Sequence, residues 1–198
     1  MKIDQKKELL TAVRAYLEHK LHGEKHPELS KDPLYKKELG LFVTLHEEGD
    51  LRGCIGYIQG FKPLSKALFE MADAAAFHDP RFLPLLESEL DDVEIEISIL
   101  SELKEVPKYR DIIIGSHGIL LKQGMRQAVF LPQVAPEQGW NLETTLKHLC
   151  RKAGLAPKAY KDVNTKFEVF TAEVFSEEED TKGRIYEGAK EKCTRVEK

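Results

Sequence analysis

The sequence lacks several patterns that would assign it to a common class of protein. Its 198 residues include only three cysteines. None of them forms a C-x-x-C pair, which argues against a disulfide framework and a zinc knuckle. No apolar run approaches the roughly 18 residues that a membrane span needs, and no apolar segment follows the charged N-terminus as in a signal peptide. We therefore expect reduced thiols and a cytoplasmic location.

Glycine-rich nucleotide motifs and a strong charge of one sign are missing as well. The chain contains neither a G-x-G-x-x-G sequence nor a P-loop. Its formal net charge of −4 offers no basic field for nucleic acid, and nucleic-acid binding is a minor alternative. The residues predict no metal site and no bound cofactor. The cations that could gather into a local patch are Lys36, Lys37, Arg52, Lys62 and Lys66.

What is present is the pattern of a globular α+β protein. Apolar residues make up 41% of the chain and charged residues 32%, which are ordinary values. Apolar spacing and turn signals predict helices over residues 4–22, from 63 and over 141–151, and strands over 40–46, 51–58, 91–100, 119–122, 127–131 and 167–175. We expect a mainly antiparallel sheet flanked by helices, in a single domain of residues 1–198. Its larger lobe would comprise about residues 1–100 plus 160–198, and a smaller inserted lobe about residues 101–159.

The most informative stretch is Leu51-Arg52-Gly53-Cys54-Ile55-Gly56-Tyr57. Two glycines cost a strand stability, so something requires a bare backbone around Cys54. Alternation along the strand places Arg52 on the face of Cys54, where a cation favours the reactive thiolate. Gly53 would leave the opposite face open, and Gly56 would leave a gap on the cysteine's own face. The pattern indicates a reactive or ligand-facing cysteine, or else a small buried residue where another element packs closely.

A second cluster, His78-Asp79-Pro80-Arg81-Phe82, follows the predicted end of the helix that starts near residue 63. It groups an imidazole, a carboxylate and a guanidinium. His78 could simply interact with the negative end of the helix dipole. Alternatively, His78 or Arg81 faces the Cys54 strand, since the helix directly follows that strand in sequence.

Ser116 and His117 lie between two glycines and suggest a nucleophile with its base. Adjacent residues rarely point at one another, and the G-x-S-x-G elbow is absent, so turn formation is the stronger interpretation. The other two cysteines carry less information. Cys150 lies on the apolar face of a predicted helix and is expected in the core, and Cys193 is expected to be exposed and incidental.

Several ordered stretches together resemble one family. They are Leu51–Gly56, Ala74–Ala76 through Asp79–Phe82, Glu96–Leu100, Leu131–Ala135 with Trp140, and Leu149–Leu155. This series resembles the AMMECR domain family, whose bacterial and archaeal members are called AmmeMemoRadiSam system protein A. The resemblance spans about residues 5–176, with Tyr57 where the family usually has threonine. It implies a two-lobed α+β fold built on antiparallel sheet, and a Memo-like protein and a radical-SAM protein as possible partners.

The resemblance settles no reaction, and whether the protein is an enzyme stays open. In an enzyme, Cys54 would be the nucleophile or a covalent carrier, and Arg52 would lower its pKa or hold an anionic group. His78 or His117 would serve as acid or base. The residues expected to contact a ligand are Gly53, Gly56, Arg81 and His117.

The alternative is an adaptor that works through the Memo-like or radical-SAM partner. The Cys54 stretch would then shape a docking groove. The loop Pro132–Trp140, which holds the only tryptophan, would add aromatic and apolar contacts. The sequence does not indicate an oligomeric state.

Overall fold

The computed structural model describes residues 1–177 and 184–185, so Cys193 lies outside the described residues. The chain forms two compact units. The first comprises residues 1–102 and 173–184, and the second residues 103–172 and 185–198, as far as each is described. The second unit therefore includes residues 160–172, which the sequence-based division placed in the larger lobe. No helix in the described part of the chain is long and apolar enough to cross a membrane.

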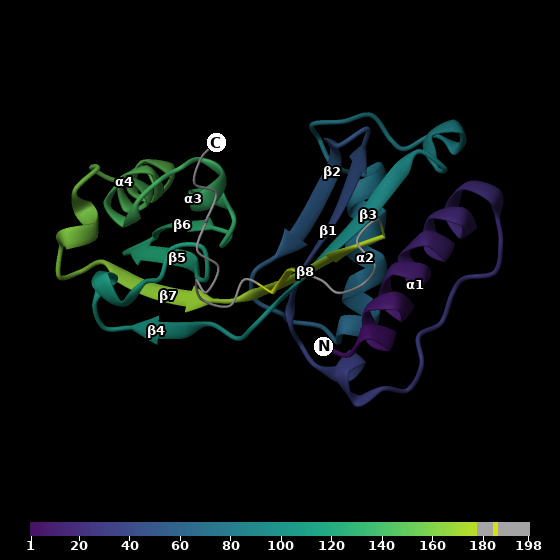
Figure 1. The fold of residues 1–198 in the computed structure, drawn as a ribbon, viewed down its shortest axis with the longest axis horizontal. Coiled ribbons are helices and arrows are strands. Elements are labelled where there is room, and N and C mark those ends of the chain that lie inside the picture. Colours follow the sequence, from purple (N-terminus) through teal and green to yellow (C-terminus); the bar gives the residue numbers. More distant parts are fainter. Residues whose placement is uncertain (178–183, 186–198) are drawn as a thin grey trace, which may run out of the picture. The chain divides into compact units, whose positions relative to one another are not determined.

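The first unit is a sheet covered by helices α1 (Ile3–His22) and α2 (Leu64–Phe77) (Figure 1). Alternate residues of the central strands face these helices and form the core, among them Val43, Leu45 and Ile97. Helix α2 packs on β1 and β2, and α1 packs on α2 and β3. The strand order is β2-β1-β3-β8-β9, with bounds β1 (Gly40–Glu47), β2 (Asp50–Tyr57), β3 (Val93–Leu100), β8 (Ala172–Ser176) and β9 (Arg184–Ile185).

Strands β1 and β2 form the predicted hairpin, but with an irregular register. Its two-residue turn has positive φ at Glu48 and Gly49, as the right-handed twist of a tight hairpin favours. Near the turn His46 pairs with Leu51, whereas Leu45 pairs with Gly53, which leaves Arg52 as the extra residue of a β-bulge. As a result, the residue opposite Cys54 is Thr44.

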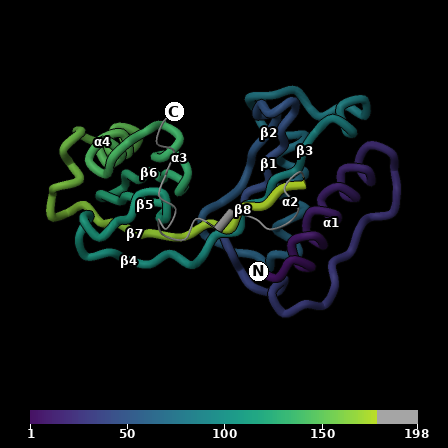
Figure 2. The backbone as a smooth tube through the Cα atoms, viewed as in Figure 1, coloured from purple at the N-terminus to yellow at the C-terminus, as the bar shows by residue number. Residues whose placement is uncertain are grey.

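The second unit is built on a four-stranded sheet with the order β4-β7-β5-β6, and Figure 2 shows β4 beside β7. Asn141 caps α4 by accepting a hydrogen bond from the backbone N–H of Thr144 at 2.9 Å. Cys150 is fully buried in this unit's core, as predicted. The bounds are β4 (Lys104–Val106), β5 (Gly118–Gln123), β6 (Arg126–Phe130), β7 (Lys166–Phe170), α3 (Val134–Glu137) and α4 (Leu142–Lys152). Four 3₁₀ turns complete the described elements: η1 (Pro33–Lys36), η2 (Glu87–Glu89), η3 (Tyr109–Asp111) and η4 (Ala159–Lys161).

The predicted α+β fold with mainly antiparallel sheet is confirmed, with one strand corrected. Residues 167–175 were expected to form one strand, but β7 and β8 belong to different sheets and Thr171 lies between them. The buried side chains change parity at this point, from Phe167 and Val169 to Phe170 and Ala172. A single flat strand cannot bury both sets on one face, so the chain changes sheet there.

Candidate functional site

Strand β2 is the edge of its sheet, and the backbone of Cys54 is held there by Asp79 and Arg81. The Cys54 N–H donates to Asp79 Oδ2 at 2.9 Å, and Arg81 Nη2 donates to the Cys54 carbonyl at 3.0 Å. The two side chains also pair directly, through Arg81 Nε to Oδ1 at 2.9 Å and Nη2 to Oδ2 at 2.6 Å. The Asp79–Arg81 pair therefore occupies the hydrogen-bonding groups that an edge strand would otherwise expose.

Asp79 is a buried carboxylate that stays ionised in this environment. Hydrogen bonds from the Arg81 side chain, and then from the Cys54 and Arg81 backbone, hold the pKa of the Asp79 carboxyl well below its usual range. Burial acts in the opposite direction but is outweighed. Asp79 and Arg81 thus form a charged clamp that fixes the position of Cys54.

The Cys54 thiol is half-buried and predominantly neutral at neutral pH. Burial raises its pKa, and the negative charges of Asp79 and Glu96 act in the same direction. A hydrogen bond that the Thr44 hydroxyl donates to Sγ, at 3.3 Å, and the charge of Arg81 lower the pKa but do not offset the burial. The raised pKa of Cys54 is opposite to the lowered pKa expected for a thiolate activated by a neighbouring arginine.

Arg52 holds a loop and is not paired with the thiol. Its Nε and Nη2 donate to the two carboxylate oxygens of Glu89 at 2.8 and 2.9 Å, and its Nη1 donates to the Leu83 carbonyl at 3.0 Å. Its side chain is only 11% exposed. Hydrogen bonds from Arg52 lower the pKa of the Glu89 carboxyl. Arg52 therefore fixes residues 83–89 against the bulge in β2.

Both glycines of the stretch are required by packing. A Cβ at Gly53 would lie 2.3 Å from the carbonyl oxygen of Ala75 in α2, so the face opposite Cys54 is occupied by that helix. A Cβ at Gly56 would lie 2.4 Å from the Phe42 ring, so the expected gap on the cysteine's face is filled. Neither glycine leaves open space for a ligand at its Cβ position.

A pocket of about 590 Å³ adjoins this region of the first unit. Its volume lies within the range of small-molecule sites. Arg81 contributes to the pocket and also contacts Cys54, so the pocket and the cysteine strand share a residue. The lining consists of Arg52, Arg81, Phe82, Leu83, Pro84, Leu86 and Glu89.

The two predicted histidines have partners other than Cys54. His78, at the end of α2, pairs through Nε2 with Asp73 Oδ2 at 3.1 Å and is 67% exposed. His117 belongs to the second unit, where its Nδ1 accepts a hydrogen bond from the Ile113 N–H at 3.1 Å. Burial lowers the pKa of His117, which favours the neutral ring with its proton on Nε2.

Residues of the candidate basic patch and of the Pro132–Trp140 loop make contacts within the chain. Of the five cations considered for a basic patch, Arg52 is paired with Glu89 and Lys62 with Glu70. The Trp140 ring stacks on His148, with ring centroids 4.1 Å apart and an interplanar angle of 5°. Among the described residues, no group of three or more His, Cys, Asp or Glu side chains is arranged to hold a metal ion.

Comparison with known proteins places the chain in a family. The sequence model of the AMMECR1 family matches residues 10–175, and the chain belongs to this family. A protein of Methanothermobacter thermautotrophicus is 39% identical over 183 residues, which are 88% of this chain and 95% of the relative. A protein of Aquifex aeolicus is 41% identical over 162 residues, with 78% and 83% of the two chains covered.

A solved structure supports the same fold. The crystal structure of an uncharacterized protein from Pyrococcus horikoshii matches with a TM-score of 0.76 and 36% sequence identity. The match covers 86% of this chain and 90% of that chain. Family and fold are therefore shown, and a shared fold does not by itself specify the function of a site.

Sequence reasoning missed three contributors to the site. Asp79 had been noted in its cluster but not as the group that holds the Cys54 backbone. Thr44 could not be placed opposite Cys54, because a regular two-residue hairpin without the bulge puts it opposite Gly53. Glu89 offered no signal, since an acidic residue in a short polar connection is usually solvated.

Proposed function

We propose that the first unit binds a small ligand beside the Cys54 strand, through Arg81 and the apolar segment Phe82–Leu86, with Cys54 as the adjoining thiol. The observation that carries this proposal is the double role of Arg81. Arg81 lines the pocket and, at the same time, its guanidinium donates to the Cys54 carbonyl. Cys54 is not part of the pocket lining, but a ligand bound to Arg81 would lie on the residue that holds the Cys54 backbone and whose charge acts on the Cys54 thiol.

The hydrogen-bonding capacity of Arg81 indicates the chemistry of the ligand. Its Nε and Nη2 are used by Asp79 and Cys54, whereas its Nη1 has no hydrogen-bond partner among the described residues. The Arg81 side chain is 52% exposed, so the guanidinium is open to solvent. Because Asp79 balances the charge of Arg81, the guanidinium offers directed donors more than net charge. A carboxylate or phosphate oxygen on an apolar body fits this combination.

A neutral Cys54 restricts the step that it could perform. A thiol attacks an electrophile only after losing its proton, and the raised pKa of Cys54 keeps that proton in place at neutral pH. Thr44 is its only hydrogen-bond partner among the described residues, and a hydroxyl is a poor base. Contact with the ligand is thus the role that the geometry supports, and a nucleophilic step would require a base supplied with the ligand or by a partner.

Alkylation of Cys54 with a neutral and an anionic reagent tests the proposal. We expect iodoacetamide and iodoacetate to modify Cys54 in the folded protein, with Cys150 protected, as read by peptide mass spectrometry. Arg81→Gln should lower the ratio of the iodoacetate rate to the iodoacetamide rate at Cys54 by about threefold or more, because Asp79 is left uncompensated. The ratio cancels any change in thiolate fraction, since both reagents attack the same thiolate.

Arg110→Gln is the matched control, because Arg110 lies in the second unit and contacts the Tyr109 ring. This variant should leave the rate ratio at Cys54 unchanged. A Cys54 that reacts with neither reagent until the protein unfolds would overturn the proposal. An unchanged ratio in Arg81→Gln would remove Arg81 as the ligand-binding group.

A second candidate function is docking of a protein partner on the same segment. Leu83 is 83% exposed and Leu86 61% exposed, which is unusual for large apolar side chains this close together in sequence. The Memo-like and radical-SAM proteins are the partners to test. If the adaptor role holds, Leu83→Ser with Leu86→Ser should abolish co-purification with such a partner, while Cys54→Ser leaves it intact. Retained binding by the leucine variant would exclude this surface.

A further inference from the structure

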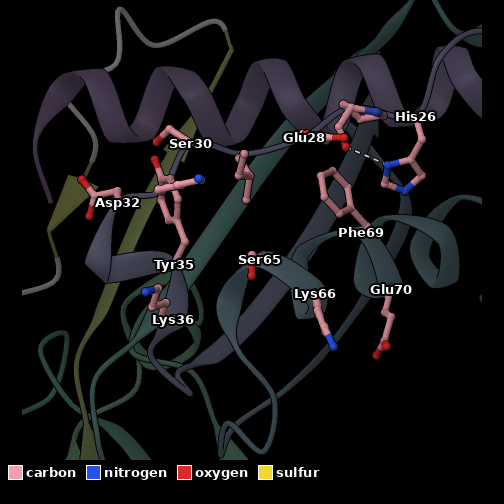
Figure 3. A pocket seen from close by; sticks show the side chains of 13 residues that line it. His26, Glu28, Ser30, Asp32, Tyr35, Lys36, Ser65, Lys66, Phe69 and Glu70 are labelled. Carbon is pink, nitrogen blue, oxygen red and sulfur yellow. Dashed lines mark hydrogen bonds between the residues drawn. The ribbon is translucent and has the colours of Figure 1, made fainter.

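A second pocket of about 590 Å³ lies elsewhere in the first unit, and its lining does not include the Cys54 strand. It is formed by the connection that follows α1, by η1, and by the first turns of α2 (Figure 3). We propose that this pocket binds a small ring compound that carries an anionic group such as phosphate or carboxylate. The proposal is independent of the function proposed for Arg81 and Cys54.

The wall formed by the connection is fixed on α1 by a set of hydrogen bonds. Glu8 accepts from the Ser30 N–H at 2.6 Å, from the Ser30 hydroxyl at 3.1 Å and from the Tyr35 hydroxyl at 2.8 Å. Asp32 accepts from Gln5 Nε2 and from the Leu34 N–H, both at 2.8 Å. Because these bonds join the connection to a long helix, the pocket is preformed, as ligand sites usually are.

Aromatic rings form one side of the pocket. The His26 and Phe69 rings lie 5.0 Å apart in an edge-to-face arrangement, and the Tyr16 ring packs behind both of them at 5.4 Å. His26 Nδ1 bonds to the Pro27 carbonyl at 2.7 Å, so this nitrogen carries the proton and the ring is fixed. Figure 3 shows Phe69 on the α2 side and His26 on the connection. A planar ring can pack on such a surface with favourable geometry.

The charged groups at the pocket favour an anion, although the lining carries both signs. Three lysines line the pocket, Lys31, Lys36 and Lys66, and none of them has an ion pair among the described residues. The carboxylate of Glu70 is paired with Lys62 at 2.6 Å, whereas Asp32 accepts from neutral donors and keeps its charge. The three lysines therefore face two carboxylates that have no ion pair in the described part of the chain, Glu28 and Asp32. Glu28 opposes an anion at the end near His26, whereas Lys36 lies near Tyr35 at the other end (Figure 3).

The hydroxyl of Ser65 also belongs to this pocket and has no partner among the described residues. Ser65 directly precedes Lys66 at the start of α2, and in Figure 3 it lies between Lys36 and Lys66. An oxygen of the ligand can therefore accept from this hydroxyl, and the flexible side chains of Lys36 and Lys66 are long enough to turn toward it. The ring of the ligand would then extend toward Phe69 and His26.

Amide chemical-shift titration of the full chain with four probes tests this site. Phenyl phosphate and benzoate each carry a ring and an anion, benzyl alcohol lacks the charge, and inorganic phosphate lacks the ring. We expect at least one of the two ring anions to shift the amides of Leu29, Ser65 and Phe69 saturably, and at least fivefold more tightly than either single-feature probe. Which of the two binds distinguishes phosphate from carboxylate recognition.

The double variant Lys36→Gln with Lys66→Gln should lower the affinity for that ring anion at least fivefold. Lys7→Gln with Lys25→Gln removes the same charge from α1 and its connection outside the pocket lining, and should leave the affinity unchanged. The proposal would be overturned if benzyl alcohol bound as tightly as the ring anion. It would also be overturned if both double variants weakened the binding of the ring anion equally. So would shifts confined to the region of Cys54 and Arg81, which would assign the probe to the other pocket.

Discussion

At the scale of single residues, the charged groups around Cys54 are arranged to fix a backbone. Asp79 and Arg81 each form one hydrogen bond with the Cys54 backbone, and at least two hydrogen bonds join them to each other. Arg52 and Glu89 form a similar two-point pair that holds the Leu83 carbonyl. Asp79 and Arg52 are the more buried partners of the two pairs, and removing the partner of a buried charge costs more than the pair itself contributes. Stability and site geometry are therefore linked at these residues.

The variant Asp79→Asn should lower the free energy of unfolding by about 1–2 kcal/mol at pH 7, because it weakens the charge-assisted hydrogen bonds of a buried carboxylate while the Arg81 charge left behind is half-exposed to water. Its acid sensitivity should also change. The pKa of Asp79 is lowered in the folded state, so below its ordinary value of about 4 the unfolded chain binds more protons. The stability that Asp79 contributes is thus present above about pH 4 and is lost as pH falls.

Urea unfolding at pH 7, 5 and 3 measures both effects. The wild type should lose more stability between pH 5 and pH 3 than Asp79→Asn does. Asp92→Asn, an exposed residue on the connection before β3, should stay within about 0.5 kcal/mol of the wild type at pH 7. An equal acid loss in wild type and Asp79→Asn would contradict the assigned ionisation of Asp79.

At the scale of elements, local patterns identified strands and helices better than they identified contacts. The alternation of Val93, Ile95 and Ile97 marked β3, and Asn141 marked the start of α4. The division between β7 and β8 was missed because the apolar run continues through it. The bond between Asp79 and Cys54 joins residues 25 apart and depends on how α2 ends beside β2. Propensity and periodicity carry no information on such a contact.

The contact of α2 with β2 depends on Gly53. A methyl group there would meet a backbone carbonyl, which cannot move aside as a side chain can. Gly53→Ala should therefore lower the free energy of unfolding by about 1–3 kcal/mol, as overpacking of a core does. Urea unfolding measures the change. Cys54→Ser, one residue away and on the opposite face, should cost less, and a Gly53→Ala variant as stable as the wild type would show that α2 can shift freely.

At the scale of the whole molecule, each unit has its own core. Leu68 of α2 is fully buried in the first, and Leu149 of α4 is fully buried in the second. Leu68→Ala and Leu149→Ala are matched cavity variants, each expected to cost about 2–5 kcal/mol. Because a unit with a separate core can open on its own, the loss of stability should be local.

Native-state hydrogen exchange of the two variants tests this independence. Leu149→Ala should lower the protection of amides in β5 and α4, with much smaller effects in β1 and β3. Leu68→Ala should do the reverse, so each variant is the control for the other. If both variants lower protection equally in all four elements, the units unfold together. Changes at the Cys54 strand could then arise from destabilising substitutions in either unit.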